Sequence, residues 1–367
     1  MNIFRNDLTE KPEVKVNVVA KTHMMSLNES DLNPLYPLRL EMSLSIAHTE
    51  INRYFTPITA TLKKNLADYV GHGVDESQIL FGNGVDDMLY FIFTSVRDNE
   101  NSFALSLAPS YFDYVTYSGS VGLKMEFLDF NKDFDFSENE YLEKLNNPDC
   151  KLGIICNPNN PTGHLVPKDK IIFILSNTKK PIIIDETYFE FSGVTFADRI
   201  KDFPNIIITR SFSKSFSAAG LRFGYIVSNA ENIKYLSKVI PFFNTSVLTQ
   251  SIANTILVYK DVVVKNNKKV LREKKRLLKE MESINEVKVH PSYTNFLTFT
   301  IGEKTNDFYE FLLENDISVR PVGAHPILKN HLRVTISKKE SNQAFLAALK
   351  SFIETKLPLN KKEKLIK

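Results

Sequence analysis

Short apolar runs, each closed by a polar or proline-rich segment, recur through the middle of the chain and constrain its fold. The runs occupy residues 103–107, 125–128, 152–156, 181–184 and 205–209. Runs this short and this rich in β-branched residues predict strands that are buried on both faces. Segments with helical spacing of apolar residues separate them. The pattern therefore predicts an α/β fold with a mainly parallel sheet flanked by helices.

Length and composition limit the kinds of protein that this chain can be. The 367 residues suit one large domain plus a smaller one. The charged fraction of 24% and the hydrophobic fraction of 43% are ordinary for a globular protein. The net charge is only +3, and lysines near the C-terminus supply part of it. This balance gives no indication of nucleic acid or a membrane surface as a partner.

The cellular location is predicted from cysteine usage and from the N-terminus. Cys150 and Cys156 are the two cysteines, and no metal-ligand spacing surrounds them. This usage is typical of a reduced intracellular compartment. Residues 1–7 lack the apolar core of a signal peptide, and no stretch has the length of a membrane span. We therefore expect a soluble, cytoplasmic protein.

Three polar residues follow the ends of three separate apolar runs. They are Asn160, Asp185 and Lys214. In a parallel sheet the carboxyl ends of the strands share one edge, so these side chains can converge on one ligand. Singly, each residue has a plain structural interpretation: a turn residue, a helix N-cap and a solvated lysine. Together, these interpretations leave the shared placement unexplained.

The surroundings of Lys214 indicate an anion-binding site. Ser211 and Ser213 stand before the lysine, and Arg222 follows it. These residues supply neutral donors and a fixed cation, which suit a phosphate. Residues 82–84 read Gly-Asn-Gly between an expected strand and an expected helix, where backbone amides can also approach an anion. An amine beside a phosphate site suggests a lysine that forms a Schiff base.

At this point the chain resembles a known family. It is similar to fold-type I pyridoxal 5'-phosphate (PLP) enzymes of the class I/II aminotransferases, and most similar to the histidinol-phosphate aminotransferase branch. The similarity covers roughly residues 45 to 340. The matching segments occur in family order and lie at 82–87, 109–111, 157–163, 185–188, 211–224 and 331–335.

The resemblance implies a role for each matching residue. Lys214 would hold PLP as a Schiff base and then move a proton between the substrate carbon and the cofactor. Asp185 would pair with the ring nitrogen and keep it protonated. The other implied cofactor contacts are Asn160 and Tyr188 at the ring hydroxyl, Tyr111 on the ring face, and Ser211, Ser213, Arg222, the amides of Gly84 and Val85, and Tyr54 of a partner subunit at the phosphate.

The resemblance also implies how substrates are held. Arg333 matches the family's carboxylate-binding arginine, and Arg320 matches an arginine that helps to hold a substrate phosphate. Arg320 could equally be a surface charge near a turn. Residues 28–34 form a longer, altered version of the family's Asn-Glu-Asn-Pro arm motif, and that arm covers the substrate. The acceptor is therefore either an imidazole-bearing keto phosphate or a smaller one of the dihydroxyacetone phosphate kind.

The implied architecture is a large PLP-binding domain at 45–255. Residues 1–44 and 256–367 would supply an N-terminal arm and a small α+β domain. We expect residues 1 to about 44 to be irregular and 248–284 to be one long helical stretch. A homodimer with shared active sites is implied. Three functions stay open: an aminotransferase that uses glutamate and a keto phosphate, a decarboxylase of a phosphorylated amino acid, and a catalytically silent PLP-binding regulator.

Overall fold

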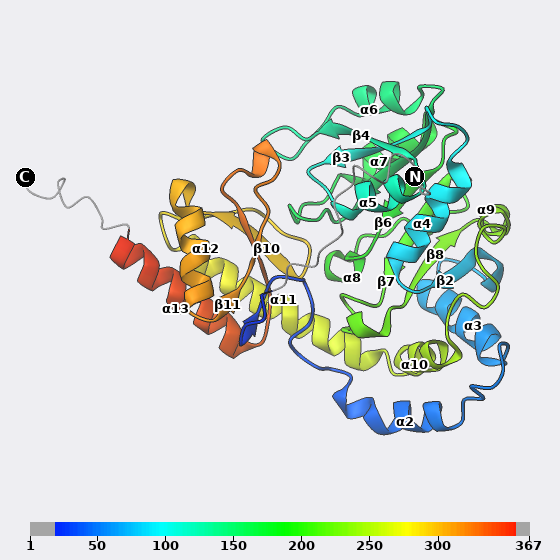
Figure 1. Cartoon of the computed structure of the whole chain (residues 1–367), viewed down its shortest axis with the longest axis horizontal. Helices are drawn as coiled ribbons and strands as arrows, with labels where there is room; N and C mark the ends of the chain where they lie inside the picture. Colours follow the sequence, from blue (N-terminus) through cyan, green and yellow to red (C-terminus); the bar gives the residue numbers. More distant parts are fainter. Residues whose placement is uncertain (1–18, 357–367) are drawn as a thin grey trace, which may run out of the picture.

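The structure is a computed structural model that describes residues 19–356. The expectations for residues 1–7 and for the lysines at 361–367 lie outside the described residues. Within that range, no helix has the length and apolar character that crossing a membrane requires. The described residues form a seven-stranded sheet with helices on both faces and, beside it, a smaller layer of strands and helices (Figure 1). The predicted α/β fold is confirmed.

The seven-stranded sheet has the strand order β2-β8-β7-β6-β5-β3-β4. β8 runs antiparallel to both of its neighbours, and the pairs from β7 to β4 are all parallel. The strands are β2 (Ile79–Gly82), β3 (Phe103–Ala108), β4 (Lys124–Asp129), β5 (Cys150–Cys156), β6 (Ile182–Asp185), β7 (Ile206–Ser211) and β8 (Gly224–Ser228). Every run predicted as a strand in this region is a strand, but β4 lies at the edge of the sheet and is exposed or half-buried, not buried on both faces as expected.

Helices join these strands and cover the sheet. They are α2 (Arg39–Ala47), α3 (Ile58–Val70), α4 (Val85–Val96), α5 (Asp113–Ser120), α6 (Glu138–Leu145), α7 (Lys168–Ser176), α8 (Phe189–Ser192), α9 (Ala230–Leu236) and α10 (Val247–Val258). Short 3-10 helices lie at Tyr36–Leu38, Glu76–Gln78, Ala197–Arg199, Ala219–Leu221, Gly302–Lys304 and Pro326–Leu328.

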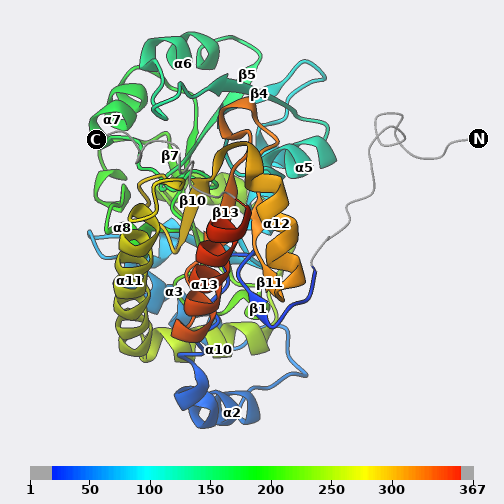
Figure 2. The ribbon, with the colours of Figure 1, turned by 90° about the vertical axis from the view of Figure 1, so that its left-hand side faces the viewer.

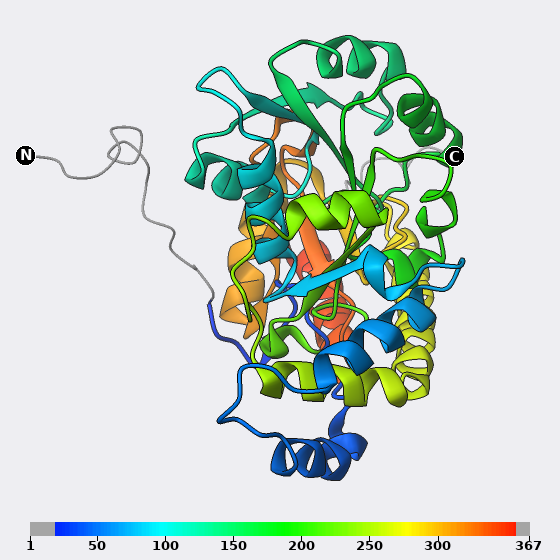
Figure 3. The same cartoon turned by 90° about the vertical axis from the view of Figure 1, so that its right-hand side faces the viewer.

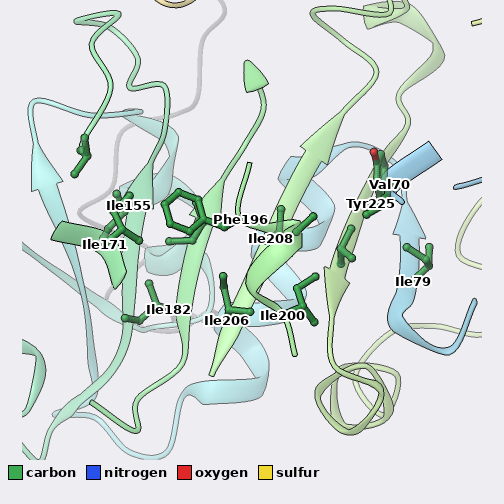
Figure 4. Close-up of a cluster of buried hydrophobic side chains, with 14 of the residues drawn as sticks. Val70, Ile79, Ile155, Ile171, Ile182, Phe196, Ile200, Ile206, Ile208 and Tyr225 are labelled. Atoms are coloured by element: carbon green, nitrogen blue, oxygen red, sulfur yellow. The ribbon is translucent and has the colours of Figure 1, made fainter. Parts of the chain in front are cut away.

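Isoleucines fill both faces of the central strands. In β6, Ile182 and Ile184 belong to the core cluster on one face, whereas Ile183 belongs to the cluster on the other. Successive side chains of a strand point to opposite faces, so a continuous apolar run is buried on both sides. Figure 4 shows the first cluster, in which isoleucines of neighbouring strands lie side by side with Phe196.

The smaller part of the structure is built on an antiparallel sheet with the order β12-β13-β10-β9. A separate parallel pair, β1 and β11, ties the start of the described chain to this part. Helices α11, α12 and α13 pack on the strands (Figure 2). The elements are β1 (His23–Met24), β9 (Lys288–Val289), β10 (Phe296–Thr300), β11 (Ile317–Ser318), β12 (Arg320–Pro321), β13 (Leu332–Thr335), α11 (Asp261–Glu282), α12 (Thr305–Glu314) and α13 (Lys339–Lys356).

Two local expectations were wrong. Residues before 45 are not all irregular, because α2 begins at Arg39 and packs on α10 at the lower edge of the molecule (Figure 3). The stretch 248–284 is not one helix, because it breaks between Val258 and Asp261. The break lets α10 pack against α2 and α3 while α11 packs against α13 and β10. The domain limits at 44 and 255 stay a prediction.

The loop after β5 joins the two sheets. The Pro161 carbonyl accepts a hydrogen bond from the Thr298 hydroxyl of β10. The Gly163 carbonyl accepts one from the backbone N–H of Tyr293, at 2.8 Å. A loop held at two points by the smaller sheet takes a position that depends on both parts of the molecule.

A buried ion pair lies beneath the carboxyl end of the central strands. The Nη2 atom of Arg210 lies 2.9 Å from Oε2 of Glu186, and both side chains are almost fully buried. The hydroxyl of Thr195 and the N–H of Phe196 also donate to Glu186. Fixed hydrogen bonds of this kind offset the desolvation of both charges.

Removal of one partner of this pair should destabilise the protein strongly. Glu186→Ala leaves the Arg210 guanidinium buried without its carboxylate, and we expect a loss of about 3–5 kcal/mol in the free energy of unfolding. Urea denaturation followed by circular dichroism measures it. Asp202→Ala is the matched control, since the Arg199–Asp202 pair is largely exposed and should cost under about 1 kcal/mol. Equal losses in the two variants would contradict this prediction.

Candidate active site

The ends of the parallel strands lie side by side in the sheet. Strand register pairs Cys156 with Asp185, and Asp185 with Thr209. Further along the same edge, Ser211 pairs with Gly224, which in turn pairs with Gly82. The residues that follow these strand ends therefore gather at one edge, as the sequence pattern predicted.

Lys214 lies in the loop after β7, and its amine is held by the N-terminal arm. Its Nζ atom donates to the carbonyl oxygen of Leu27 at 2.9 Å. Burial and, after it, the positive charge of Arg333 lower the pKa of Lys214 to about 8. About a tenth of this amine is therefore unprotonated at pH 7, far more than for an ordinary lysine, and the neutral amine is the nucleophilic form.

Asp185, the last residue of β6, is a buried carboxylate with an unequal set of partners. Its Oδ1 atom accepts from the N–H and the hydroxyl of Thr187, at 3.1 and 2.7 Å, and from the hydroxyl of Thr209, at 3.2 Å. Its Oδ2 atom accepts from the hydroxyl of Tyr114 at 2.7 Å. Burial raises the pKa of Asp185, and these hydrogen bonds oppose the rise. Oδ2 keeps acceptor capacity for one further donor.

An anion cradle forms where α4 begins. Gly84 precedes the helix with φ at 95°, and no side chain caps the helix. The first N–H groups of a helix have no acceptor within it, so they are free to bind an anion. A Cβ atom on Gly84 would lie 2.9 Å from Nη2 of Arg222, so glycine lets this guanidinium reach the helix start. The same nitrogen donates to Oδ2 of Asp86 at 2.7 Å.

The serines predicted to bind phosphate border this cradle. Ser211 and Ser213 are buried, and the Ser213 N–H donates to the Ser211 hydroxyl at 3.0 Å. Gly224 stands opposite Ser211 in the sheet, and a Cβ atom on it would come within 2.6 Å of both Gly84 and Val85. This close backbone approach brings β7, β8 and the start of α4 together. The predicted phosphate ligands of this chain are thus collected in one place.

Arg333 connects the smaller sheet to the loop after β5 and to the N-terminal arm. Its Nη1 atom donates to Oδ1 of Asn160 at 2.5 Å, and its Nη2 atom donates to the carbonyl of Ser26 at 2.8 Å. Its Nε atom is buried without a partner. Burial lowers the pKa of Arg333 to about 10. No carboxylate pairs with this guanidinium among residues 19–356.

The remaining predicted residues fall into two groups. Tyr188 and Tyr111 contact residues at the carboxyl edge of the large sheet. The Tyr188 hydroxyl accepts a hydrogen bond from Nδ2 of Asn28 at 2.9 Å, and the Tyr111 hydroxyl donates one to Asp86 at 3.4 Å. Arg320 is exposed and lies opposite Arg333 in the β12–β13 pair. Tyr54 has 80% of its surface exposed, and its ring stacks on Phe243.

Comparisons with known proteins agree with this geometry. The family model "Aminotransferase class I and II" matches residues 23–349. The chain belongs to this family. A histidinol-phosphate aminotransferase of Clostridium novyi is 32% identical over 348 residues, which are 95% of this chain and 96% of the relative.

Two solved structures share the fold of this family member. The histidinol-phosphate aminotransferase of Sinorhizobium meliloti, in complex with pyridoxal-5'-phosphate, has a TM-score of 0.85 at 20% identity and covers 96% of this chain and 98% of its own. The L-threonine-O-3-phosphate decarboxylase of Porphyromonas gingivalis has a TM-score of 0.74 at 24% identity and covers 90% and 99%. Family membership makes this chain a PLP-dependent aminotransferase.

The residues present fit PLP. The Lys214 amine has a carbonyl, and no carboxylate, as its hydrogen-bond partner in the described chain, so it can give up that bond. The Oδ2 atom of Asp185 can accept a second hydrogen bond, as a protonated ring nitrogen would donate. The cradle at Gly84 would admit a phosphate where a side chain would collide with Arg222. An aldehyde, a ring nitrogen and a phosphate are the groups that these three sites suit.

Some residues that the sequence analysis did not name also contribute to the site. Tyr114 and Thr209 hold Asp185, and Asn28 holds Tyr188. Tyr114 stands three residues after Tyr111, which indicates only that the two rings lie near each other and does not indicate the contact with Asp185. No signal in the sequence pointed to the carbonyls of Ser26 and Leu27, because every residue has one.

The pKa of Lys214 leads to a testable pH dependence. Capture of PLP by the apoprotein needs the neutral amine, so the rate should rise about tenfold per pH unit below pH 8 and then level off. Stopped-flow absorbance of free PLP measures it. Arg333→Met removes a positive charge that lowers this pKa, so the midpoint should move to higher pH. Arg272→Met, at an exposed position of α11, is the control. A midpoint that stays unchanged in Arg333→Met would contradict this account of the amine.

Proposed function

We propose that the protein transfers an amino group between an L-amino acid, with glutamate as the expected donor, and a phosphorylated keto compound. The buried guanidinium of Arg333, which has no carboxylate partner in the described chain, carries this proposal. A buried charge without a counter-ion is costly, so the site favours a ligand that brings one. A substrate carboxylate is such a ligand, and a guanidinium can bind it in bidentate fashion.

The chain's own residues divide the work in this proposal. PLP, when bound, supplies an aldehyde that Lys214 and a substrate amine can share, and a ring that withdraws electrons from the substrate carbon. Lys214 then takes the proton from that carbon, as a base whose pKa of about 8 suits neutral pH. Asp185 holds the ring nitrogen in its protonated form. Tyr188 and Asn160 hold the ring hydroxyl, and Tyr111 packs on the ring face.

The phosphate ends of cofactor and substrate have separate ligands in the proposal. Ser211, Ser213, Arg222 and the first amides of α4 would hold the cofactor phosphate, where the helix dipole also favours an anion. The substrate phosphate binds Arg320, whose side chain has no hydrogen bond or ion pair to another described residue and which lies opposite Arg333 in the β12–β13 pair. The names of the close relatives support a phosphorylated substrate of the histidinol phosphate type. We propose the cytoplasm as the place of action, given two free thiols.

An absorbance assay tests the reaction and the acceptor together. The PLP-loaded protein should lose its Schiff-base band when glutamate is added and recover it when a keto phosphate is added. The acceptors to compare are imidazole acetol phosphate and dihydroxyacetone phosphate, each with its unphosphorylated analogue as the matched control. Lys214→Ala should hold PLP noncovalently and show neither change. Carbon dioxide release from a phosphorylated amino acid, with no change on adding glutamate, would replace this proposal by the decarboxylase alternative.

We also propose a homodimer in which Tyr54 reaches the partner's cofactor phosphate. A group of large apolar side chains is exposed in the single chain, and a second copy would bury it. Its members lie on α2, between α2 and α3, and between α9 and α10. The group consists of Leu40, Leu44, Ile51, Tyr54, Phe55, Phe242 and Phe243, with exposed fractions from 51% to 95%. α2 projects from the body of the molecule (Figure 3), which suits a role in holding another subunit.

Subunit mixing tests this arrangement. Lys214→Ala and Tyr54→Ala should each be nearly inactive as purified variants. If Tyr54 serves the partner's site, mixed dimers hold one intact site, and a reassociated equal mixture should recover about a quarter of the wild-type activity. Light scattering gives the mass of each sample. Recovery close to zero in mixtures shown to contain mixed dimers would contradict a shared site.

A further inference from the structure

Tyr114 contacts two of the residues that are predicted to contact the cofactor. It lies on α5 and is fully buried. Its hydroxyl donates to Oδ2 of Asp185 at 2.7 Å. Its ring packs edge-on against Tyr111, with 5.3 Å between the ring centroids. One side chain thus contacts both the carboxylate expected at the ring nitrogen and the aromatic ring expected on the cofactor face.

The hydroxyl of Tyr114 is a fixed donor. Burial, and next the negative charge of Asp185, raise the pKa of Tyr114 far above its ordinary value, so the proton stays on the phenol. The thiol of Cys156 is the other titratable side chain beside this hydroxyl, and burial raises its pKa as well. A phenol that keeps its proton stabilises the charged form of Asp185 against burial.

The position of this bond on the carboxylate matters. Three donors occupy Oδ1 of Asp185, whereas Tyr114 is the donor on Oδ2. The free acceptor capacity of the carboxylate is therefore on the oxygen that Tyr114 holds. Rotation of the carboxylate would break the Tyr114 bond, so this bond fixes the direction in which the free capacity points.

We propose that Tyr114 is a positioning residue that keeps Asp185 ionised and oriented toward the cofactor ring. The proposal rests on the proposed role of Asp185 and adds a residue that touches neither substrate nor cofactor phosphate. It predicts that the hydroxyl of Tyr114, and not its bulk, is needed for fast proton removal at the substrate carbon.

The first experiment uses the apoprotein and Tyr114→Phe, which keeps the ring contact with Tyr111 and removes the donor. The folded pKa of Asp185 is already above its unfolded value, and loss of the donor raises it further. The folded state of the variant therefore holds the Asp185 proton to higher pH, so its stability deficit against the wild type should widen as pH rises from about 4. Thermal melting at a series of pH values measures it. The other titratable neighbours, Cys156 and Tyr188, have raised pKa values and stay protonated in this range.

Tyr141→Phe is the matched control. Tyr141 is equally buried, on α6, and its hydroxyl bonds the backbone at Leu105 and Ile154, with no contact to Asp185. The loss of stability of Tyr141→Phe relative to the wild type should be the same at every pH in the series. If Tyr114→Phe does not fold, Asp185→Asn provides a second route, because asparagine keeps the shape of the side chain and removes its charge. The free energy of unfolding of Asp185→Asn should lack the pH dependence that Asp185 gives the wild type above about pH 4.

The second experiment uses the PLP-loaded enzyme. In Tyr114→Phe, kcat should fall about ten- to a hundredfold, the effect of one hydrogen bond to a charged group, while KM for glutamate stays within about twofold. The 15N chemical shift of labelled PLP should report less protonated ring nitrogen at pH 7. A pH-independent deficit like that of Tyr141→Phe, or an unchanged kcat and 15N shift, would overturn the proposal. The apoprotein result does not depend on PLP, so it fails separately from the proposed function.

Discussion

One buried guanidinium holds the site together. Arg333 comes from the smaller sheet, and its two terminal nitrogens bond the loop after β5 and the N-terminal arm. Its charge also helps to lower the pKa of Lys214, which comes from the larger sheet. Three segments that are far apart in sequence thus meet at a single cation. The cost of burying that cation is met only in part by neutral acceptors, which is why the site is suited to an anionic substrate.

The larger sheet and its polar edge could be predicted from sequence because their signals are local. The isoleucine runs of β6 and β7 have no helical spacing, so they indicated buried strands. Parallel strands bring their carboxyl ends to one edge by geometry alone, which placed Asp185 and Lys214 in the same region before any contact was known. The anion cradle followed from glycines between a strand and a helix, since that arrangement exposes backbone N–H groups.

Other features could not be predicted because they depend on distant partners. Nothing around Tyr114 indicates that its hydroxyl meets a carboxylate 71 residues later. The division between α10 and α11 has no proline or glycine to mark it, and it arises because the two helices pack on different layers. The bond from Arg333 to Oδ1 of Asn160 was also not foreseen; it leaves the Nδ2 donor of Asn160 for the ring hydroxyl, a role that stays a prediction. Tertiary contacts of this kind are visible only once the fold is known.

The N-terminal arm lines the site mainly with its main chain. The carbonyl of Ser26 accepts a hydrogen bond from Arg333, and the carbonyl of Leu27 accepts one from Lys214. Asn28 uses its side chain instead, which donates to the Tyr188 hydroxyl. A carbonyl is the same in every residue, so substitutions at positions 26 and 27 leave the chemistry of this wall unchanged. Insertions and deletions, in contrast, move the carbonyls themselves. A change in the length of the arm is therefore a more direct route to a new substrate than a substitution at these two positions.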